Sequence, residues 1–210
     1  MGYLRRLCSA SLRQGWPLYL AVTGVLGLGI LTGSLGANSL QAEQAAELHR
    51  YLQTFLAQVS EIDLDQAQMA RSALYDNLLA GAIIYILGLT IICLPLVLAF
   101  IFIRGFVLGF TVGFLATQQE LQGFFIIVMS MLPHNIFFVP ALIIGGTASV
   151  SFSLLLIRRF YNSQTPVWPG FMSYTLIMVG VMAVFFIAAL TEAYITPEMT
   201  RFSATFLAGW

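Results

Sequence analysis

Charged side chains divide this chain into five long stretches of apolar and small residues. Apart from one histidine, His134, no Asp, Glu, Lys or Arg side chain interrupts residues 14–42, 77–103, 105–119, 121–157 and 160–191. A charge at the centre of a bilayer is costly, and about 20 apolar residues cross the hydrocarbon core as a helix. The pattern predicts an all-α, polytopic integral membrane protein.

The positions of these stretches predict about five transmembrane helices. The first span covers about residues 17–37, the second 78–103, with a kink at Pro95, and the last 171–190. A cleaved signal peptide is the alternative for the first span, because small residues cluster between Gly33 and Ala37. Its length of about 20 residues favours a retained span.

The middle of the chain, residues 105–157, is expected to cross twice through broken helices. A short helix over 105–117 is followed by polar residues at 118–122, and a second short run meets Pro133-His134-Asn135. Proline interrupts helices, and freed backbone groups inside a membrane need protein or water partners. Residues 105–132 therefore form either a broken span or a re-entrant hairpin.

Arginine placement predicts the orientation, because positive residues are retained on the cytoplasmic side. With the N terminus inside and the C terminus outside, six arginines lie inside: Arg5, Arg6, Arg13, Arg104, Arg158 and Arg159. All nine acids then fall outside or at the outer boundary. Residues 1–16 become a cytoplasmic amphipathic tail, and residues 38–76 become an extracytoplasmic loop.

The predicted outer loop, residues 38–76, is acidic and contains a helical apolar stripe. It carries six acids and two arginines, a net charge of −4. The stripe recurs at helical spacing and consists of Leu48, Leu52, Phe55, Leu56 and Val59. It either packs on the outer ends of the spans or docks an extracytoplasmic partner. Residues 193–210 form a similar tail, for which interfacial anchoring or partner binding is expected.

Small residues recur every four positions in two of the predicted spans. They are Gly105, Gly109 and Gly113 in one span, and Gly145, Ser149 and Ser153 in another. Such spacing lets helix backbones approach closely in a membrane. Packing within the chain is the first interpretation, and homo-oligomerisation is the second.

Three polar side chains inside or beside the membrane are candidate functional residues. His134 and Asn135 follow a predicted break, where they satisfy freed backbone groups or line a transport path. Glu192 lies at the outer end of the last span, and ionisable residues at membrane depth are functional candidates. It is functional, or it is a carboxylate that pairs with His134 or Arg71, or it is simply hydrated.

Composition agrees with a single membrane domain over residues 1–210. The chain is 59% hydrophobic and only 9% charged, whereas a soluble domain carries roughly a quarter charged residues. Its nine basic residues are scattered arginines, which gives no nucleic-acid signal. Cys8 and Cys93 have no disulfide or metal-ligand spacing, and no known hydrolase or phosphate-loop motif occurs, so no cofactor, metal or catalytic residue is expected.

Short motifs along the whole chain resemble the stage II sporulation protein M family. They are Asn38-Ser39-Leu40, Gln58-Val59-Ser60, Leu94-Pro95-Leu96, residues 104–114, Pro133-His134-Asn135 with Pro140-Ala141, Ser151-Phe152-Ser153 and residues 189–197. In the wider family a glutamate tends to follow the proline–histidine turn, where this chain has Phe138. The chain therefore resembles the sporulation branch.

The resemblance implies a role in endospore formation, at the septal and engulfing cell membrane. It further implies a complex with stage II sporulation proteins D and P, which degrade peptidoglycan. The resulting expectation is a non-enzymatic membrane scaffold for these partners. The alternative is a transporter or channel component that uses broken helices at residues 105–140, and an unrecognised intramembrane enzyme is the third class.

Overall fold

The computed structural model describes residues 2–41, 43–48, 50–51, 66–91, 94–118, 121–161 and 166–195, and all regular structure in these ranges is helical. The long elements are α1 (Gly2–Asn38), α3 (Gln66–Gly88), α4 (Leu94–Gln118), α5 (Leu121–Tyr161) and α6 (Trp168–Leu190). A π-helical turn, η1 (Thr191–Ile195), continues α6.

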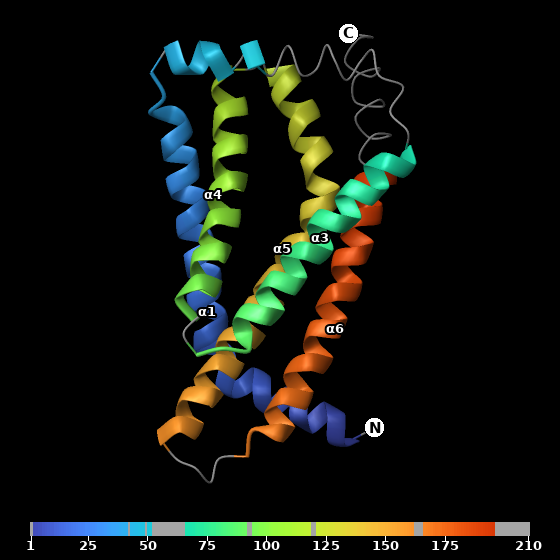
Figure 1. The fold of residues 1–210 in the computed structure, drawn as a ribbon. Coiled ribbons are helices and arrows are strands. Elements are labelled where there is room, and N and C mark those ends of the chain that lie inside the picture. Colours follow the sequence, from blue (N-terminus) through green and yellow to red (C-terminus); the bar gives the residue numbers. More distant parts are fainter. Residues whose placement is uncertain are drawn as a thin grey trace.

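The five long helices run alternately up and down between two ends of the bundle (Figure 1). The N terminus lies at the end that we call the lower end, together with the last turn of α5 and its Arg158 and Arg159. The turn η1 lies at the upper end. The N terminus and η1, the last described segment, therefore lie at opposite ends of the bundle, and arginine placement predicts that the lower end faces the cytoplasm.

Four helical segments are long and apolar enough to cross a membrane: Trp16–Asn38, Leu94–Phe114, Met131–Tyr161 and Trp168–Ile195. Helix α3 runs alongside α5 and α6 and carries Arg71 and Asp76 in its first half (Figure 1). The prediction of a polytopic all-α membrane protein is confirmed.

The prediction of a second span over residues 78–103 was wrong. Helix α3 ends at Gly88, and α4 begins at Leu94 after a tight turn. Pro95 is the second residue of α4, where the first turn needs no amide donor and the fixed φ of proline suits the helix. Pro95 therefore begins a helix and does not kink one.

The prediction of broken helices over residues 105–157 was wrong at Pro133-His134-Asn135, whereas the break predicted at residues 118–122 falls where α4 ends and α5 begins. Helix α4 continues to Gln118, and α5 is one helix of 41 residues with Pro133 and Pro140 inside it. Arg104, expected at the cytoplasmic boundary, lies ten residues into α4. It is thus about 15 Å from the start of that helix, at the depth of the membrane interior.

Helices α1 and α4 pack backbone to backbone through glycines. A methyl group at Gly105 or Gly109 would overlap the carbonyl oxygen of Leu26 or Ile30 on α1, and one at Gly113 would lie 2.9 Å from Cα of Ser34. Gly29 and Gly33 on α1 approach the α4 backbone equally closely. The glycine stripe of α4 is therefore occupied by the chain's own first span.

The main core joins all five helices. Its most deeply buried large side chains include Val22, Ile84, Ile101, Leu142 and Phe185, which come from α1, α3, α4, α5 and α6 respectively. Along α6 the buried positions are spaced by three or four residues, as one helix face requires: Tyr174, Met178, Val181, Phe185 and Ala188. Gly145 faces α6, where a methyl group would lie 3.2 Å from Val181.

One predicted docking residue packs inside the chain instead. Leu48, on the short helical segment after α1, packs with Ala37 and Phe114 at the upper ends of α1 and α4. Leu52, Phe55, Leu56 and Val59 lie outside the described residues, as do positions 196–210 of the predicted C-terminal tail. The N-terminal tail is helical and continuous with α1, which contains Pro17.

Candidate functional site

A cluster of three polar side chains joins α3, α5 and η1 near the upper end of the bundle. The Nδ1 atom of His134 lies 3.3 Å from Oε2 of Glu192, and Nδ2 of Asn77 donates to the same oxygen at 3.3 Å. Asn77 uses its second amide hydrogen on the carbonyl oxygen of Ala73, at 2.8 Å. Side chains of α3 and α5 thus hold one carboxylate oxygen of η1.

The proton on His134 can be placed from its partners. Besides Glu192, Nδ1 lies 3.3 Å from the carbonyl oxygen of Ala188. Both neighbours are hydrogen-bond acceptors, so Nδ1 must be the nitrogen that carries a hydrogen. The imidazole ring is oriented further by stacking on Phe138, with centroids 5.1 Å apart, and Phe138 in turn stacks on Phe185 at 4.9 Å.

The local structure around Glu192 explains how this carboxylate reaches α3 and α5. Helix α6 widens into the π-helical turn η1, and π-turns occur frequently at functional sites. The hydroxyl of Thr191 donates to the carbonyl oxygen of Ile187 at 2.9 Å, and Thr191 and Ala193 are buried. Glu192 is therefore presented from a well-packed turn.

The Glu192 carboxylate is accessible from outside the bundle, although Asn77 and His134 both contact it. Its side chain is 45% exposed, against 19% for His134, and it lines a cavity of about 230 Å³ with Ser72, Ala73, Asp76 and Ala193. Both observed contacts go to Oε2, and a carboxylate has about four acceptor positions. The site can therefore accept a further donor from outside the bundle.

Among the sequence-predicted polar residues, the structure brings together His134 and Glu192 but not Asn135. The Asn135 amide donates back to the carbonyl oxygen of Met131, four residues earlier in α5, at 2.8 Å. His134 is the partner of Glu192 that the sequence suggested. Asn77 was missed, although it is the first residue of a charge-free stretch, directly after Asp76.

A second polar cluster is buried in the lower half of the bundle, where it caps the last turn of α3. Helix α3 tightens at its end: the amide of Leu89 pairs with the Ile86 carbonyl oxygen, three residues back, instead of with that of Tyr85. The Tyr174 hydroxyl donates to the Tyr85 carbonyl oxygen at 2.9 Å, and Ser149 donates to that of Ile84 at 2.9 Å. Side chains from α5 and α6 thus supply donors that the ending helix lacks.

Ser153 extends this cluster by one turn of α5. Its hydroxyl lies 3.1 Å from the carbonyl oxygen of Gly88 and 3.4 Å from that of Thr90. At Gly88 a methyl group would overlap the Tyr174 hydroxyl and lie 2.8 Å from Oγ of Ser149. Two of the small residues predicted for helix packing, Ser149 and Ser153, therefore act through hydrogen bonds as well as through their size.

Arg104 is the one charged residue of α4, and it lies near the middle of that helix. Its guanidinium lies 5.4 Å from the centroids of both Phe100 and Phe138. A cation–π contact contributes roughly 0.5–2 kcal/mol, whereas an arginine at a helix centre costs roughly 2.5–3.5 kcal/mol on an insertion scale. The two ring contacts together are of the same order as this cost, so Phe100 and Phe138 offset much of it.

The fold defines the class of this protein, and comparison with known proteins gives its family. A bundle of apolar helices with glycine-packed backbones, buried hydroxyl–carbonyl contacts and one intramembrane arginine defines a polytopic helical membrane protein. The sequence profile of the stage II sporulation protein M family matches residues 22–197, and the chain belongs to this family. Neither the curated proteins nor the solved structures contain a match.

Proposed function

We propose that this chain is a non-enzymatic membrane anchor that recruits and localises peptidoglycan-degrading partners, the stage II sporulation proteins D and P, at the septal and engulfing membrane. Membership of the sporulation family supports the setting. The observation that carries the proposal is the accessible Glu192 carboxylate, fixed by Asn77 and His134 at the upper end of the bundle.

The upper end offers a surface that suits a protein partner. Tyr75 and Tyr194 are 66% and 51% exposed, and they are the neighbours in sequence of Asp76 and Ala193, which line the cavity beside Glu192. Tyrosine combines a large apolar ring with a polar hydroxyl and is enriched at interfaces. The accessible carboxylate of Glu192 in this cavity would orient a basic or amide donor of the partner.

The continuity of two helices weighs against the transport alternative. The transport hypothesis rested on broken helices over residues 105–140, and α4 and α5 are continuous through their described parts. The partners, and not this chain, would then supply the wall-degrading activity.

Replacing Glu192 by glutamine tests the proposed function. Glutamine keeps the size of the side chain and an oxygen acceptor for Asn77 and His134, but it removes the negative charge. We expect Glu192→Gln to accumulate normally, while partner recovery on co-purification from sporulating cells falls at least tenfold and engulfment fails. Glu47→Gln, the same change at an exposed position after α1, is the matched control and should behave as wild type.

Two readouts separate a folding defect from a loss of recruitment. Membrane abundance and thermal unfolding in detergent should be unchanged in Glu192→Gln, because the side-chain contacts are retained. Normal co-purification of the partners and normal engulfment with this variant would refute the role of Glu192. An equal loss of partner recovery with Glu47→Gln would also refute it, because the loss would then follow from removing any negative charge at the upper end.

A further inference from the structure

Arg104 lies at the centre of a membrane span. It is the eleventh of the 21 residues of Leu94–Phe114, so about 15 Å of helix separates it from either end of the span. The rings of Phe100 and Phe138 offset much of the cost of its charge, but the guanidinium also carries five N–H donors. Among the described residues, no oxygen accepts a hydrogen bond from Arg104 and no acid pairs with it. These donors therefore need an acceptor.

The chain itself offers no acid at the depth of Arg104. All nine acids lie outside the five charge-free stretches. Glu192 is the one acid within the four membrane spans, and it lies near the upper end, where Asn77 and His134 contact it. Asp76 lines the same upper cavity as Glu192. A second copy in the same orientation carries its acids at the same levels, so the counter-charge comes from a different molecule.

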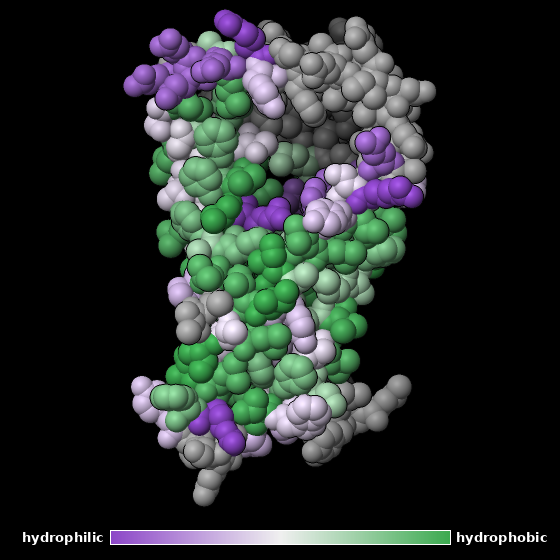
Figure 2. Space-filling view, viewed as in Figure 1, coloured by the Kyte–Doolittle hydropathy of each residue, from purple (hydrophilic) through white to green (hydrophobic). Residues whose placement is uncertain are grey.

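The face of α4 beside Arg104 is open to such a molecule. Leu96, Ile103 and Val107 are 52%, 57% and 52% exposed, and their spacing of seven and four residues places them on one helix face. This face points away from the glycine stripe that α1 covers. Helices α3 and α4 diverge above the turn that joins them (Figure 1). Near mid-height on this side, Figure 2 shows hydrophilic residues surrounded by hydrophobic ones.

We propose that this face of α4 docks a transmembrane helix of another protein, and that an aspartate or glutamate near the middle of that helix binds Arg104. Ionisable residues inside membranes pair with one another, and polar side chains hold transmembrane helices together. The planar fork of a guanidinium matches a carboxylate with two parallel hydrogen bonds. Leu96, Ile103 and Val107 supply the apolar contacts along the same face.

A lipid phosphate suits Arg104 less well than a carboxylate on a helix. Phosphates lie outside a hydrocarbon core about 30 Å thick, and Arg104 lies in the middle of its span. The two rings also keep the guanidinium beside α5. The inference does not depend on the role proposed for Glu192, because it concerns a different surface at a different depth.

Binding of synthetic transmembrane peptides to the purified full-length protein in phosphatidylcholine liposomes tests this proposal. The probe is a leucine–alanine helix with one aspartate at its centre, and the comparison peptides carry asparagine or leucine there. Energy transfer between labelled peptide and labelled protein measures binding. We expect the aspartate peptide to bind wild type at least tenfold more tightly than either comparison peptide. Arg104→Leu should lose this preference, and Arg158→Leu, the same change at an exposed arginine, should keep it.

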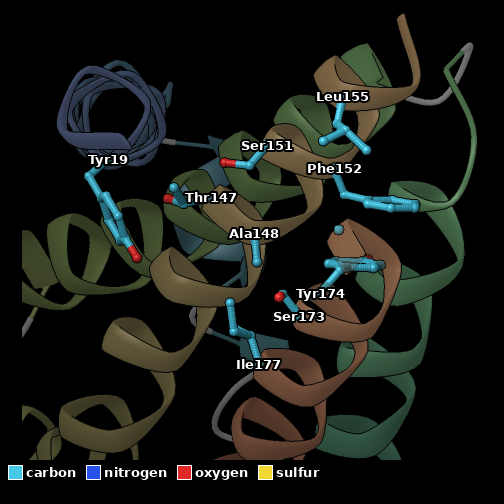
Figure 3. Close-up of a pocket in the computed structure, with 10 residues that line it drawn as sticks. Tyr19, Thr147, Ala148, Ser151, Phe152, Leu155, Ser173, Tyr174 and Ile177 are labelled. Carbon is cyan, nitrogen blue, oxygen red and sulfur yellow. The ribbon is translucent and has the colours of Figure 1, made fainter. Parts of the chain in front are cut away.

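A pair of bulky substitutions tests the docking face itself. Ile103→Trp should weaken binding of the aspartate peptide at least tenfold, because the larger side chain stands between the helices. Ile177→Trp is the matched control, since Ile177 lines a separate hollow between α1, α5 and α6 (Figure 3). In detergent, Arg104→Leu should unfold at the same temperature as wild type or higher, because it removes a charge from the hydrocarbon.

Equal binding of the three peptides to wild type would overturn the proposal, as would an undiminished preference in Arg104→Leu or Ile103→Trp. A lower unfolding midpoint of Arg104→Leu with the preference intact would make Arg104 a structural residue. If phosphatidylglycerol in the liposomes abolished the preference for the aspartate peptide, a lipid phosphate would be the ligand of Arg104 and the helix assignment would be wrong.

Discussion

Replacing Gly109 with valine is expected to separate α1 from α4 and to prevent accumulation of the folded protein. A side chain at this position would overlap the carbonyl oxygen of Ile30, so backbone meets backbone and no flexible side chain can yield. Overpacking of a tight core costs typically 1–3 kcal/mol, and the rigidity of both partners here leads us to expect about 3 kcal/mol or more. Membrane abundance and the unfolding midpoint in detergent measure the effect.

Gly24→Val is the matched control for this prediction. Gly24 lies on α1 as well, but no atom lies within 4 Å of a methyl group built there. The same residue change on the partner helix should therefore leave abundance near the wild-type level. If Gly109→Val accumulated and unfolded as Gly24→Val does, the glycine contact between α1 and α4 would not be the packing that holds the first span.

Removing the hydroxyl of Tyr174 is the second change with a large expected effect. Tyr174→Phe leaves the carbonyl oxygen of Tyr85 without its donor, because the amide of Leu89 already pairs with Ile86. Leaving a buried polar group unsatisfied costs roughly 1–3 kcal/mol. We expect a lower unfolding midpoint and faster proteolysis near the α3–α4 turn.

A tyrosine outside the core provides the comparison for this variant. Tyr161 is 86% exposed at the lower end of α5, so Tyr161→Phe should not change the midpoint. Ser149→Ala removes the neighbouring donor of the same cluster, to Ile84. Because the two hydroxyls are 3.0 Å apart, the double variant should cost less than the sum of the single changes. Strict additivity would mean that the two hydroxyls do not act as one cluster.

The sequence predicted a membrane protein whose helices run alternately up and down, but it misplaced the turn between two of them. Residues 77–119 hold 43 positions with the single charge of Arg104, so the absence of other charges does not show where in this stretch the chain turns. Placing the boundary at Arg104 followed from the rule that arginine stays in the cytoplasm. The structure instead keeps this arginine inside α4, over Phe100 and Phe138, and turns the chain between Gly88 and Leu94.

The candidate site was predictable only in part, for a physical reason. Glu192 and His134 are rare polar groups in apolar surroundings, so the sequence alone singles them out. Asn77 looks ordinary in sequence, because its role depends on which helices are its neighbours. Likewise, Ser149 and Ser153 resemble a packing stripe until the end of α3 is placed beside them.

Photo-crosslinking from the two ends of the bundle tests the central claim most directly. A benzophenone amino acid would replace Tyr75 or Tyr194 at the upper end, or Tyr161 at the lower end, all of which are exposed. In sporulating cells we predict crosslinks to stage II sporulation protein D or P from the two upper positions and not from Tyr161. Crosslinks from Tyr161 alone, or from none of the three positions while both partners are present, would contradict a wall-facing anchor.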